Sequence, residues 1–269
     1  MKHPWIEPTR GRRRSPGRLR RVSTAASVPE VRFRSDVTVE LVRGAASDRD
    51  VLFAARVSTQ GEQTLEAAQE QAAETAPRDR GLINYLMRDR HGSPFEHNSM
   101  TFYVQAPIFV FREFQRHRIA SYNEESGRYR ELRPVFYTPA PDRRLVQEGK
   151  PGHYEFVPGT PEQHATVERE IRESSAAAYA SYRRMLEAGI AREVARAVLP
   201  LNIYSSMYVT VNARALMNFL SLRTRREDAA FPSFPQREIE MCAERMEELW
   251  RELMPITAAC FDANGRVAP

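Results

Sequence analysis

The sequence has few of the residues on which several protein classes depend. Only two of its 269 residues are cysteine, Cys242 and Cys260, and they show no metal-binding spacing. No apolar run comes near the roughly 20 residues that a membrane helix requires, and the N-terminus lacks the apolar core of a signal peptide. We therefore expect a reduced, cytoplasmic protein that has no metal site.

Net positive charge is also absent outside one segment. The formal net charge is +5, but residues 1–34 hold ten basic and two acidic residues, which leaves 30 basic and 33 acidic residues elsewhere. Residues 1–34 therefore have the composition of a disordered basic extension, and we expect the folded domain to span residues 35–269. Two alternative interpretations of this extension are an arm that binds nucleic acid or a membrane surface, and a start codon placed too early.

The hydrophobic pattern mixes strands and long helices without regular alternation. This favours an α+β fold, with a mixed or antiparallel sheet flanked by long helices, over a doubly wound sheet. We interpret 60–78 as an exposed helix or loop and 134–160 as a Pro- and Gly-rich connection. The alternation predicts strands at 37–42, 99–105 and 203–211. The helical periodicity and caps predict helices at 48–58, 80–90, 107–117, 161–188, 191–198, 212–223 and 236–261.

The segment from Arg116 to Arg128, which reads RHRIASYNEESGR, has the least ordinary composition in the chain. Its guanidinium, hydroxyl and amide groups suit a polyanionic ligand, above all a phosphate. We expect it on a loop, where a rigid scaffold commonly presents binding residues. A solvated charged loop is the alternative. The chain has no Gly-rich phosphate loop and no G-x-G-x-x-G motif, so side chains and helix ends would hold any nucleotide.

Three further segments combine polar residues with apolar surroundings. His91 and His97 flank Gly-Ser-Pro-Phe-Glu, a spacing that is not a recurrent zinc motif and favours hydrogen bonding or a turn. Arg192–Arg196 reads REVAR, in which Glu193 and Arg196 share a helical face and can pair with each other or with an anion. The helix expected at 212–223 has polar side chains at Asn212, Arg214, Asn218 and Arg223, for which capping and surface exposure are the alternative interpretation.

These segments together resemble the flavin-dependent thymidylate synthases. Residues 116–128 match the signature R-H-R-x-x-S-x-N-E-x-S-x-R of that family without a gap. PFEH at 94–97, APIFV at 106–110, REVAR at 192–196, LPLN at 199–202 and VNAR at 211–214 extend the similarity over residues 37–261. The resemblance implies the fold of that family and a homotetramer with shared active sites.

The resemblance also implies roles for individual residues. FAD is expected to contact Ser93, Arg116, His117, Arg118, Glu124, Asn212, Arg214 and Asn218, with His91 near the flavin and the folate. dUMP is expected to be surrounded by Glu113, Phe114, Gln115, Arg116, Glu124, Glu125, Ser126, Gly127, Arg128, Arg196 and Arg223. Arg223 is the expected catalytic residue, because it matches the arginine that favours ionisation of the uracil at N3, and a guanidinium stays charged at any working pH.

The implied reaction is the reductive methylation of dUMP to dTMP. Methylenetetrahydrofolate would supply the carbon, FAD would carry the hydride, and NADPH would reduce the flavin. Substrate binding is the favoured role for Ser126, and a nucleophile is the alternative. Neither cysteine lies in a site-like segment, so no cysteine nucleophile is expected.

The chain departs from the family pattern at two places. Relatives often have Gln where this chain has Glu113, and the segment after Arg223 is longer and lacks a histidine that some relatives carry. Arg225 and Arg226 are alternative candidates for that histidine's contact with folate or flavin. Two other classes remain as hypotheses, an Arg-rich nucleic-acid-binding module and a histidine-dependent metal hydrolase.

Overall fold

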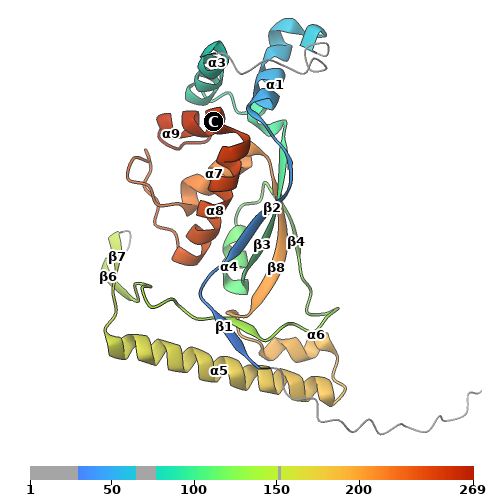
Figure 1. Cartoon of the computed structure of the whole chain (residues 1–269), viewed down its shortest axis with the longest axis vertical. Coiled ribbons are helices and arrows are strands. Elements are labelled where there is room, and N and C mark those ends of the chain that lie inside the picture. Colours follow the sequence, from blue (N-terminus) through green and yellow to red (C-terminus); the bar gives the residue numbers. More distant parts are fainter. Residues whose placement is uncertain (1–29, 65–76, 151–152) are drawn as a thin grey trace, which may run out of the picture.

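The fold is built around one four-stranded antiparallel sheet. The structure, a computed structural model, describes residues 30–64, 77–150 and 153–269. The strands are ordered β2-β3-β8-β4 across the sheet. Their bounds are Thr38–Ala45 for β2, Ser99–Pro107 for β3, Tyr204–Val211 for β8 and Ser121–Glu124 for β4. Strands distant in sequence therefore lie side by side, with β3 and β8 at the centre (Figure 1).

The two faces of the sheet differ in polarity, as the alternation of residues along β3 requires. Met100, Phe102 and Val104 are fully buried under the helices. On the opposite face Thr101 and Tyr103 form hydrogen bonds across to β8, the hydroxyl pairs Thr101–Thr210 and Tyr103–Ser206 each at 2.9 Å. The apolar face fixes the register, because a slip by one residue would turn those side chains to the other face.

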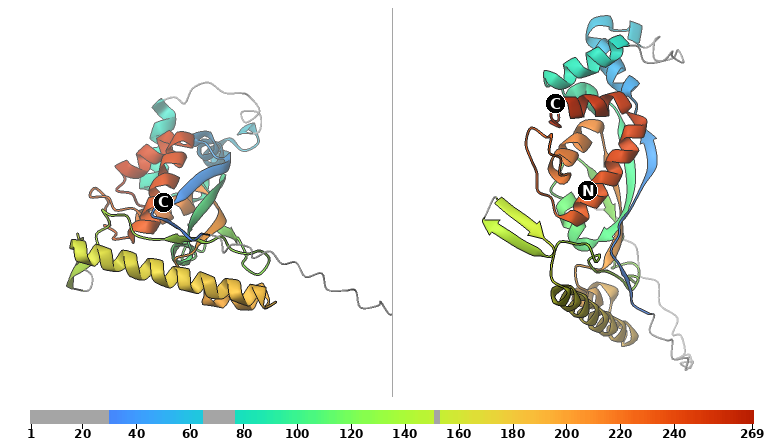
Figure 2. Two further views of the ribbon diagram at one scale, coloured as in Figure 1. Left: turned by 60° about the horizontal axis from the view of Figure 1, so that its bottom comes forward. Right: turned by 60° about the vertical axis from the view of Figure 1, so that its left-hand side comes forward.

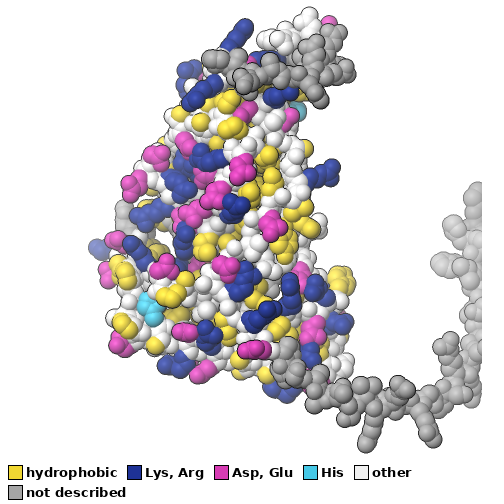
Figure 3. Space-filling view, viewed as in Figure 1, with side chains coloured by type: hydrophobic (Ala, Val, Ile, Leu, Met, Phe, Trp, Pro, Cys, Tyr) yellow, Lys and Arg dark blue, Asp and Glu magenta, His cyan; other side chains and the backbone are white. Residues whose placement is uncertain are grey.

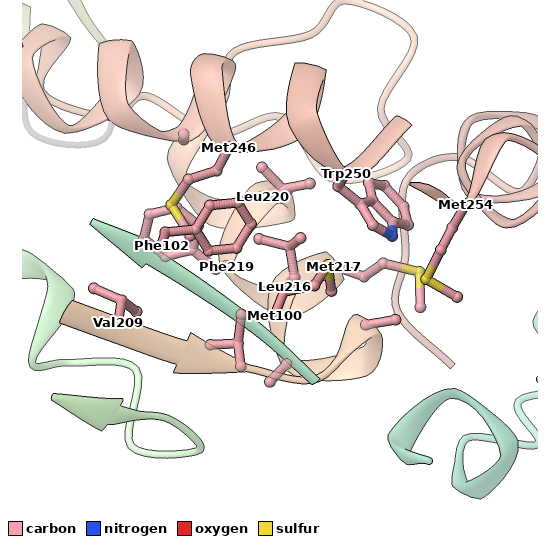
Figure 4. Packing of buried hydrophobic residues seen from close by; sticks show 14 of the residues in the cluster. Met100, Phe102, Val209, Leu216, Met217, Phe219, Leu220, Met246, Trp250 and Met254 are labelled. Atoms are coloured by element: carbon pink, nitrogen blue, oxygen red, sulfur yellow. The ribbon is translucent and has the colours of Figure 1, made fainter. Parts of the chain in front are cut away.

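Helices cover the apolar face of the sheet (Figures 1 and 2). They are α4 (Ile108–Phe114), α7 (Ala213–Arg223) and α8 (Arg237–Leu253), with α1 (Asp48–Gln60), α3 (Pro77–Arg88) and α9 (Pro255–Ala263) at one end. Figure 4 shows Leu216 and Leu220 of α7 between Trp250 and Met246 of α8 and the strands, so α7 is the middle layer of the core.

A second, smaller core lies at the other end of the sheet, beneath the long helix α5 (Pro161–Glu187). Here β1 (Arg32–Arg34) pairs in parallel with β5 (Val135–Tyr137), and Phe136 packs on Tyr179 with their ring centroids 6.1 Å apart. A hairpin of β6 (Val146–Lys150) and β7 (His153–Val157) projects from this end. The short helices α6 (Arg192–Ala195) and η2 (Arg196–Val198) follow α5.

The expected α+β fold with an antiparallel sheet is confirmed, and most long elements lie where the sequence predicted them. Helix α5 begins where Thr160 caps it and ends before Gly189, whose φ of +82° suits glycine. Several elements begin or end elsewhere than expected; for example, α3 starts at Pro77, α4 ends at Phe114 and β8 starts at Tyr204. Part of the segment expected at 60–78, residues 65–76, lies outside the described residues.

Four expectations need correction. Residues 121–124 of the arginine-rich motif form edge strand β4 rather than loop, because β8 offers them a hydrogen-bonding partner. The connection at 134–160 contains three strands. The last helix is two helices, since Pro255 cannot donate the hydrogen bond that would continue α8. Residues 32–34, expected within the disordered extension, form β1, while residues 1–29 lie outside the described part.

Charged side chains of both signs are interspersed over the face in Figure 3. That face carries no continuous basic surface of the kind that a nucleic-acid-binding module requires. Among the residues that the structure describes, no helix is long and apolar enough to cross a membrane.

Removal of a core side chain from α7 tests how far the fold depends on this helix. Leu216→Ala should lower the free energy of unfolding by about 2–5 kcal/mol, because the site is fully buried among large side chains. Leu222→Ala on the same helix, where Leu222 is 58% exposed, is the matched control and should change it by less than about 0.5 kcal/mol. Urea unfolding at one protein concentration measures both, and equal losses would contradict the packing described.

Candidate active site

Helix α7 carries one of the four polar segments and packs against two others. It follows β8 without a loop, and Asn212 caps it, because the Asn212 Oδ1 accepts a hydrogen bond from the Ala215 amide at 2.8 Å. The Ala213 amide donates to Asn98 Oδ1 at 2.7 Å, which ties the start of α7 to the segment after His97. Asn212 is therefore a capping residue, the alternative that its position allowed.

The N-terminal half of α7 packs on the His91–His97 segment. Arg214 Nη1 lies 2.5 Å from Glu96 Oε1, and the guanidinium lies so close to Gly92 that a Cβ there would sit 2.5 Å from Arg214 Nε. A side chain at position 92 would therefore displace the Arg214 guanidinium from this place. The exposed Ser93 begins the 3₁₀ turn η1 (Ser93–Glu96) beside it, which places the expected flavin contacts Ser93 and Arg214 together.

The other two expected residues of this part of the site lie nearby on the surface. His91 is exposed and stacks on Tyr85 with ring centroids 5.5 Å apart. Asn218 is exposed, and its Nδ2 donates to the Arg214 carbonyl at 3.1 Å. Among the described residues no three His, Cys, Asp or Glu side chains are grouped so that they could hold a metal ion.

The C-terminal half of α7 packs on the first part of the arginine-rich motif. The Arg223 guanidinium donates to Glu113 Oε2 at 2.6 Å and, through Nε, to His117 Nε2 at 3.0 Å. Phe219, one turn earlier, stacks on Phe114 at 5.0 Å and meets the His117 ring edge-on at 4.8 Å. Arg223 is therefore held from two sides, with 18% of its side chain exposed.

Burial shifts the pKa of both partners of Arg223, in opposite directions. Burial, and then the neighbouring Arg223 charge, lower the pKa of His117 to about 4, so the imidazole is neutral at pH 7 and its Nε2 can accept. Burial raises the pKa of Glu113 while Arg223 opposes that rise. Glu113 Oε1 is buried without a hydrogen-bond partner among the described residues, so this carboxylate is only half satisfied.

The next residues of the motif are exposed at the end of α4. Gln115 caps α4, and Arg116 and Arg118 are exposed and form no ion pair within the described part of the chain. Tyr122, which the sequence did not single out, fixes this turn, because its hydroxyl donates toward the carbonyls of Phe114 at 2.7 Å and His117 at 2.8 Å. Its only signal was an aromatic residue inside a polar motif.

The second part of the motif lies with the REVAR segment instead. Arg128 Nε is 3.1 Å from Glu193 Oε2, and a Cβ on Gly127 would lie 3.2 Å from Arg196 Cδ. Ser126 Oγ accepts from the Arg128 amide at 3.3 Å, and no base contacts it among the described residues. This geometry gives Ser126 a turn-forming role and offers nothing that would activate a nucleophile.

Strand β4 connects the two groups of residues. It carries Glu124, which is exposed, and leads to Glu125, whose Oε1 is 3.0 Å from Arg130 Nε in an ion pair without hydrogen-bond geometry. Within the described residues, no hydrogen bond or ion pair joins the group around α7 (residues 91–96, 113–118 and 212–223) to the group of residues 126–128 and 192–196. The sequence did not predict this division.

The two arginines after α7 differ in their surroundings. Arg226 pairs with the buried Glu247 at 3.3 Å. Arg225 is exposed, with its guanidinium 5.6 Å from the centre of the Phe234 ring. Arg225 and Phe234 line a cleft of about 1390 Å³ between the β6–β7 hairpin and the start of α8. Arg225 is thus the one of the two whose charge faces open space.

Comparisons with known proteins identify the family of the chain. A family model described as thymidylate synthase complementing protein matches residues 40–256. The flavin-dependent thymidylate synthase of Streptomyces coelicolor is 66% identical over 245 residues, which cover 91% of this chain and 98% of that protein. The chain belongs to this family.

Other members differ more in sequence but align over most of their length. The flavin-dependent thymidylate synthase of Tropheryma whipplei is 62% identical over 237 residues, which cover 88% of this chain and 97% of that protein. The crystal structure of the UMP/dUMP methylase PolB from Streptomyces cacaoi, bound with 5-Br UMP, is also similar. It gives a TM-score of 0.82 at 55% identity and covers 90% of this chain and 100% of that one. The match indicates that the described residues adopt the family fold.

The contact between Arg223 and His117 can be tested by titration. Arg223→Gln should raise the pKa of His117 above about 4, because the nearby positive charge that disfavours imidazolium is removed, although burial keeps the pKa below 6.5. Imidazole NMR shifts followed from pH 3 to 8 measure the change. An unchanged pKa would contradict the contact.

The same titration has a consequence for stability. The folded-state pKa of His117 lies below its ordinary value of 6.5, so the folded protein binds fewer protons than the unfolded chain between pH 4 and 6.5. The contribution of His117 to the free energy of unfolding is therefore fully present above pH 6.5 and is lost as the pH falls toward 4.

Proposed function

We propose that this protein catalyses the reductive methylation of dUMP to dTMP as an FAD-dependent thymidylate synthase. The observation that supports this most directly is Arg223, which Glu113 and His117 hold at the end of the same helix that carries Arg214. A fixed guanidinium with a neutral histidine beside it can stabilise negative charge that develops on a pyrimidine without titrating itself.

The residues around α7 suit a flavin. Arg116, Arg118 and Arg214 offer guanidinium donors for the diphosphate of FAD, and the exposed Ser93 and Asn218 add hydrogen-bonding groups. Glycine at position 92 allows the Arg214 guanidinium to lie beside Ser93, where a side chain would displace it. FAD when bound would supply the hydride, and the protein would supply binding and orientation.

The second group of residues suits the phosphate of dUMP. Arg128 and Arg196 are exposed beside the turn of Ser126 and Gly127, where a guanidinium can bind a phosphate through two parallel hydrogen bonds. Glu193, now paired with Arg128, would exchange that partner when a dianion arrives. Arg223 would then contact the uracil ring and favour its ionisation at N3.

Within one chain, no hydrogen bond or ion pair among the described residues joins the residues proposed to bind the phosphate to the group around α7. We therefore propose that each active site is shared between subunits of a homotetramer. Residues 126–128 with Arg196 would come from one subunit, and Arg223 with the flavin residues from another. Methylenetetrahydrofolate as carbon donor and NADPH as reductant, in a cytoplasmic enzyme, complete the proposal. Arg225, exposed beside its cleft, is the better candidate for a folate or flavin contact than the paired Arg226.

UMP is a second candidate substrate, because the structurally similar PolB is described as a methylase of UMP and dUMP. The two nucleotides differ by one hydroxyl group, and a site built to hydrogen-bond that hydroxyl would discriminate strongly between them. Parallel assays with both nucleotides therefore decide the substrate.

Turnover tests the proposed function. The purified protein should be yellow and should form dTMP from dUMP with methylenetetrahydrofolate and NADPH. Arg223→Ala should lower kcat by about 10²-fold or more, as removal of a charge-stabilising donor does, while flavin stays bound. Failure of the wild-type protein to form dTMP, aerobically or anaerobically, would refute the function. Loss of flavin from the variant would refute the place given to Arg223.

Glu113 provides a sharper test of how Arg223 is held. Glu113→Gln should keep kcat/KM for dUMP within about threefold, because an amide oxygen can still accept from Arg223. Glu113→Ala should lower it by about tenfold or more, since Arg223 loses its anchor. Flavin content serves as the control for folding. Equal activity of the two variants would contradict an orienting role for Glu113.

A further inference from the structure

The segment after α9, residues 264–269, runs along α7 in the opposite direction. It begins at the C-terminal end of α7, where Arg266 Nη2 donates to Thr224 Oγ1 at 3.1 Å. It ends at the N-terminal half, where Arg214 Nε donates to the main-chain oxygen of Pro269 at 2.6 Å. Arg90 Nη1 donates to the Ala268 carbonyl at 2.7 Å between them. One short segment therefore contacts both ends of the helix that carries Arg214 and Arg223.

Arg266 is the fixed point of this segment. It is 3% exposed, and its guanidinium contacts Glu247 Oε1 at 2.8 Å and Oε2 at 2.9 Å, Asp262 at 2.6 Å and the face of the Phe261 ring. Its φ of +57° is one that residues other than glycine rarely adopt. A buried charge in a disfavoured backbone conformation persists only where its contacts require it.

The pKa of Glu247 also indicates that Arg266 is held firmly in its place. Burial alone would raise the pKa of Glu247, but its hydrogen bonds and charge interactions with Arg266 and Arg251 outweigh burial and lower the pKa. Glu247 is therefore a carboxylate at neutral pH, and its two hydrogen bonds with Arg266 hold that guanidinium against Thr224.

Thr224 connects Arg266 to the last turn of α7, next to Arg223. It follows Arg223 directly, is 2% exposed, and its hydroxyl donates to the Leu220 carbonyl at 2.7 Å while it accepts from Arg266. Ser233 Oγ donates to the Thr224 carbonyl at 2.7 Å, and the Ala230 amide donates to the Gly265 carbonyl at 2.9 Å. The last turn of α7 and the base of the segment 224–236 are thus fixed by residues 264–266.

We propose that Arg266 is a positioning residue for Arg223 and that residues 264–269 set the positions of Arg223 and Arg214 at the two ends of α7. This inference rests on the proposed function for the roles of those two arginines, although the positioning itself does not. The local sequence does not mark Arg266 for this role, because the partners that join it to α7 and α8 lie at positions 224 and 247.

Thr224 variants test the positioning of Arg223 while leaving the buried pair of Arg266 and Glu247 in place. Thr224→Val removes the hydroxyl that accepts from Arg266, and should lower kcat by about tenfold, in the range expected for a small misplacement of a catalytic group. It should also raise the pKa of His117, because Arg223 moves away from the imidazole. Thr224→Ser keeps the hydroxyl and should restore both values.

The control variant is Arg251→Gln. Arg251 also contacts Glu247 and Asp262, but among the described residues no hydrogen bond or ion pair joins it to Thr224 or α7. This change therefore weakens the same ion network and leaves the hydrogen bonds to the helix in place. Its kcat and the His117 pKa should stay as in the wild type. If Thr224→Val leaves both quantities unchanged, or if Arg251→Gln changes them as much, the positioning role is wrong.

A chain without residues 267–269 tests the other end. Loss of the Pro269 and Ala268 contacts should weaken flavin binding by the apo-protein about tenfold, measured by fluorescence titration, and leave the His117 pKa unchanged. Unchanged flavin affinity would overturn this half of the inference. Because the His117 titration does not depend on turnover, wild-type protein that makes no dTMP would refute the proposed function and leave the positioning test standing.

Discussion

The packing of helix α7 is the constraint on which the rest of the structure depends. Six of its residues are buried, among them Leu216, Phe219 and Leu220, and each such side chain contributes about 1.5–3 kcal/mol by leaving water. This apolar packing between α8 and the sheet decides where the helix lies. Its arginines at positions 214 and 223 then lie where the two ends of the helix emerge from the core, and both meet carboxylates there.

The burial of Arg223 costs free energy of hydration, and the partners that offset this cost also hold the guanidinium in place. A guanidinium removed from water needs partners, and Glu113 and His117 supply them. The partners are unequal, since one is a carboxylate with an unsatisfied oxygen and the other is held neutral by burial and by Arg223 itself. In the proposed reaction a developing charge on uracil would compete with Glu113 for the same guanidinium.

Sequence alone predicted the elements that have strong periodicity or strong caps. Helix α5 has Thr160 before it and Gly189 after it, and β3 alternates without interruption. It missed the strands β1 and β5, which have three residues each and exist because they pair with each other. The long signature also supplied the candidate site residues, through the resemblance to the family. Sequence alone could not predict their division into two groups, since that depends on where β8 places β4 and α7. Nor could it predict the role of Arg266, whose contacts with Thr224 and Glu247 are distant in sequence.

Arg128 and Arg223 differ in burial in a way that suits the roles proposed for them at the two ends of a nucleotide. A phosphate arrives fully charged and strongly hydrated, so it is best met by guanidinium groups that still face water, and 52% of the Arg128 side chain is exposed. A uracil ring gains charge only during the reaction, and a donor stabilises that charge best where water is excluded. Only 18% of the Arg223 side chain is exposed. A single surface could not offer both environments, which is a physical reason for the site to be assembled from separate parts of the fold.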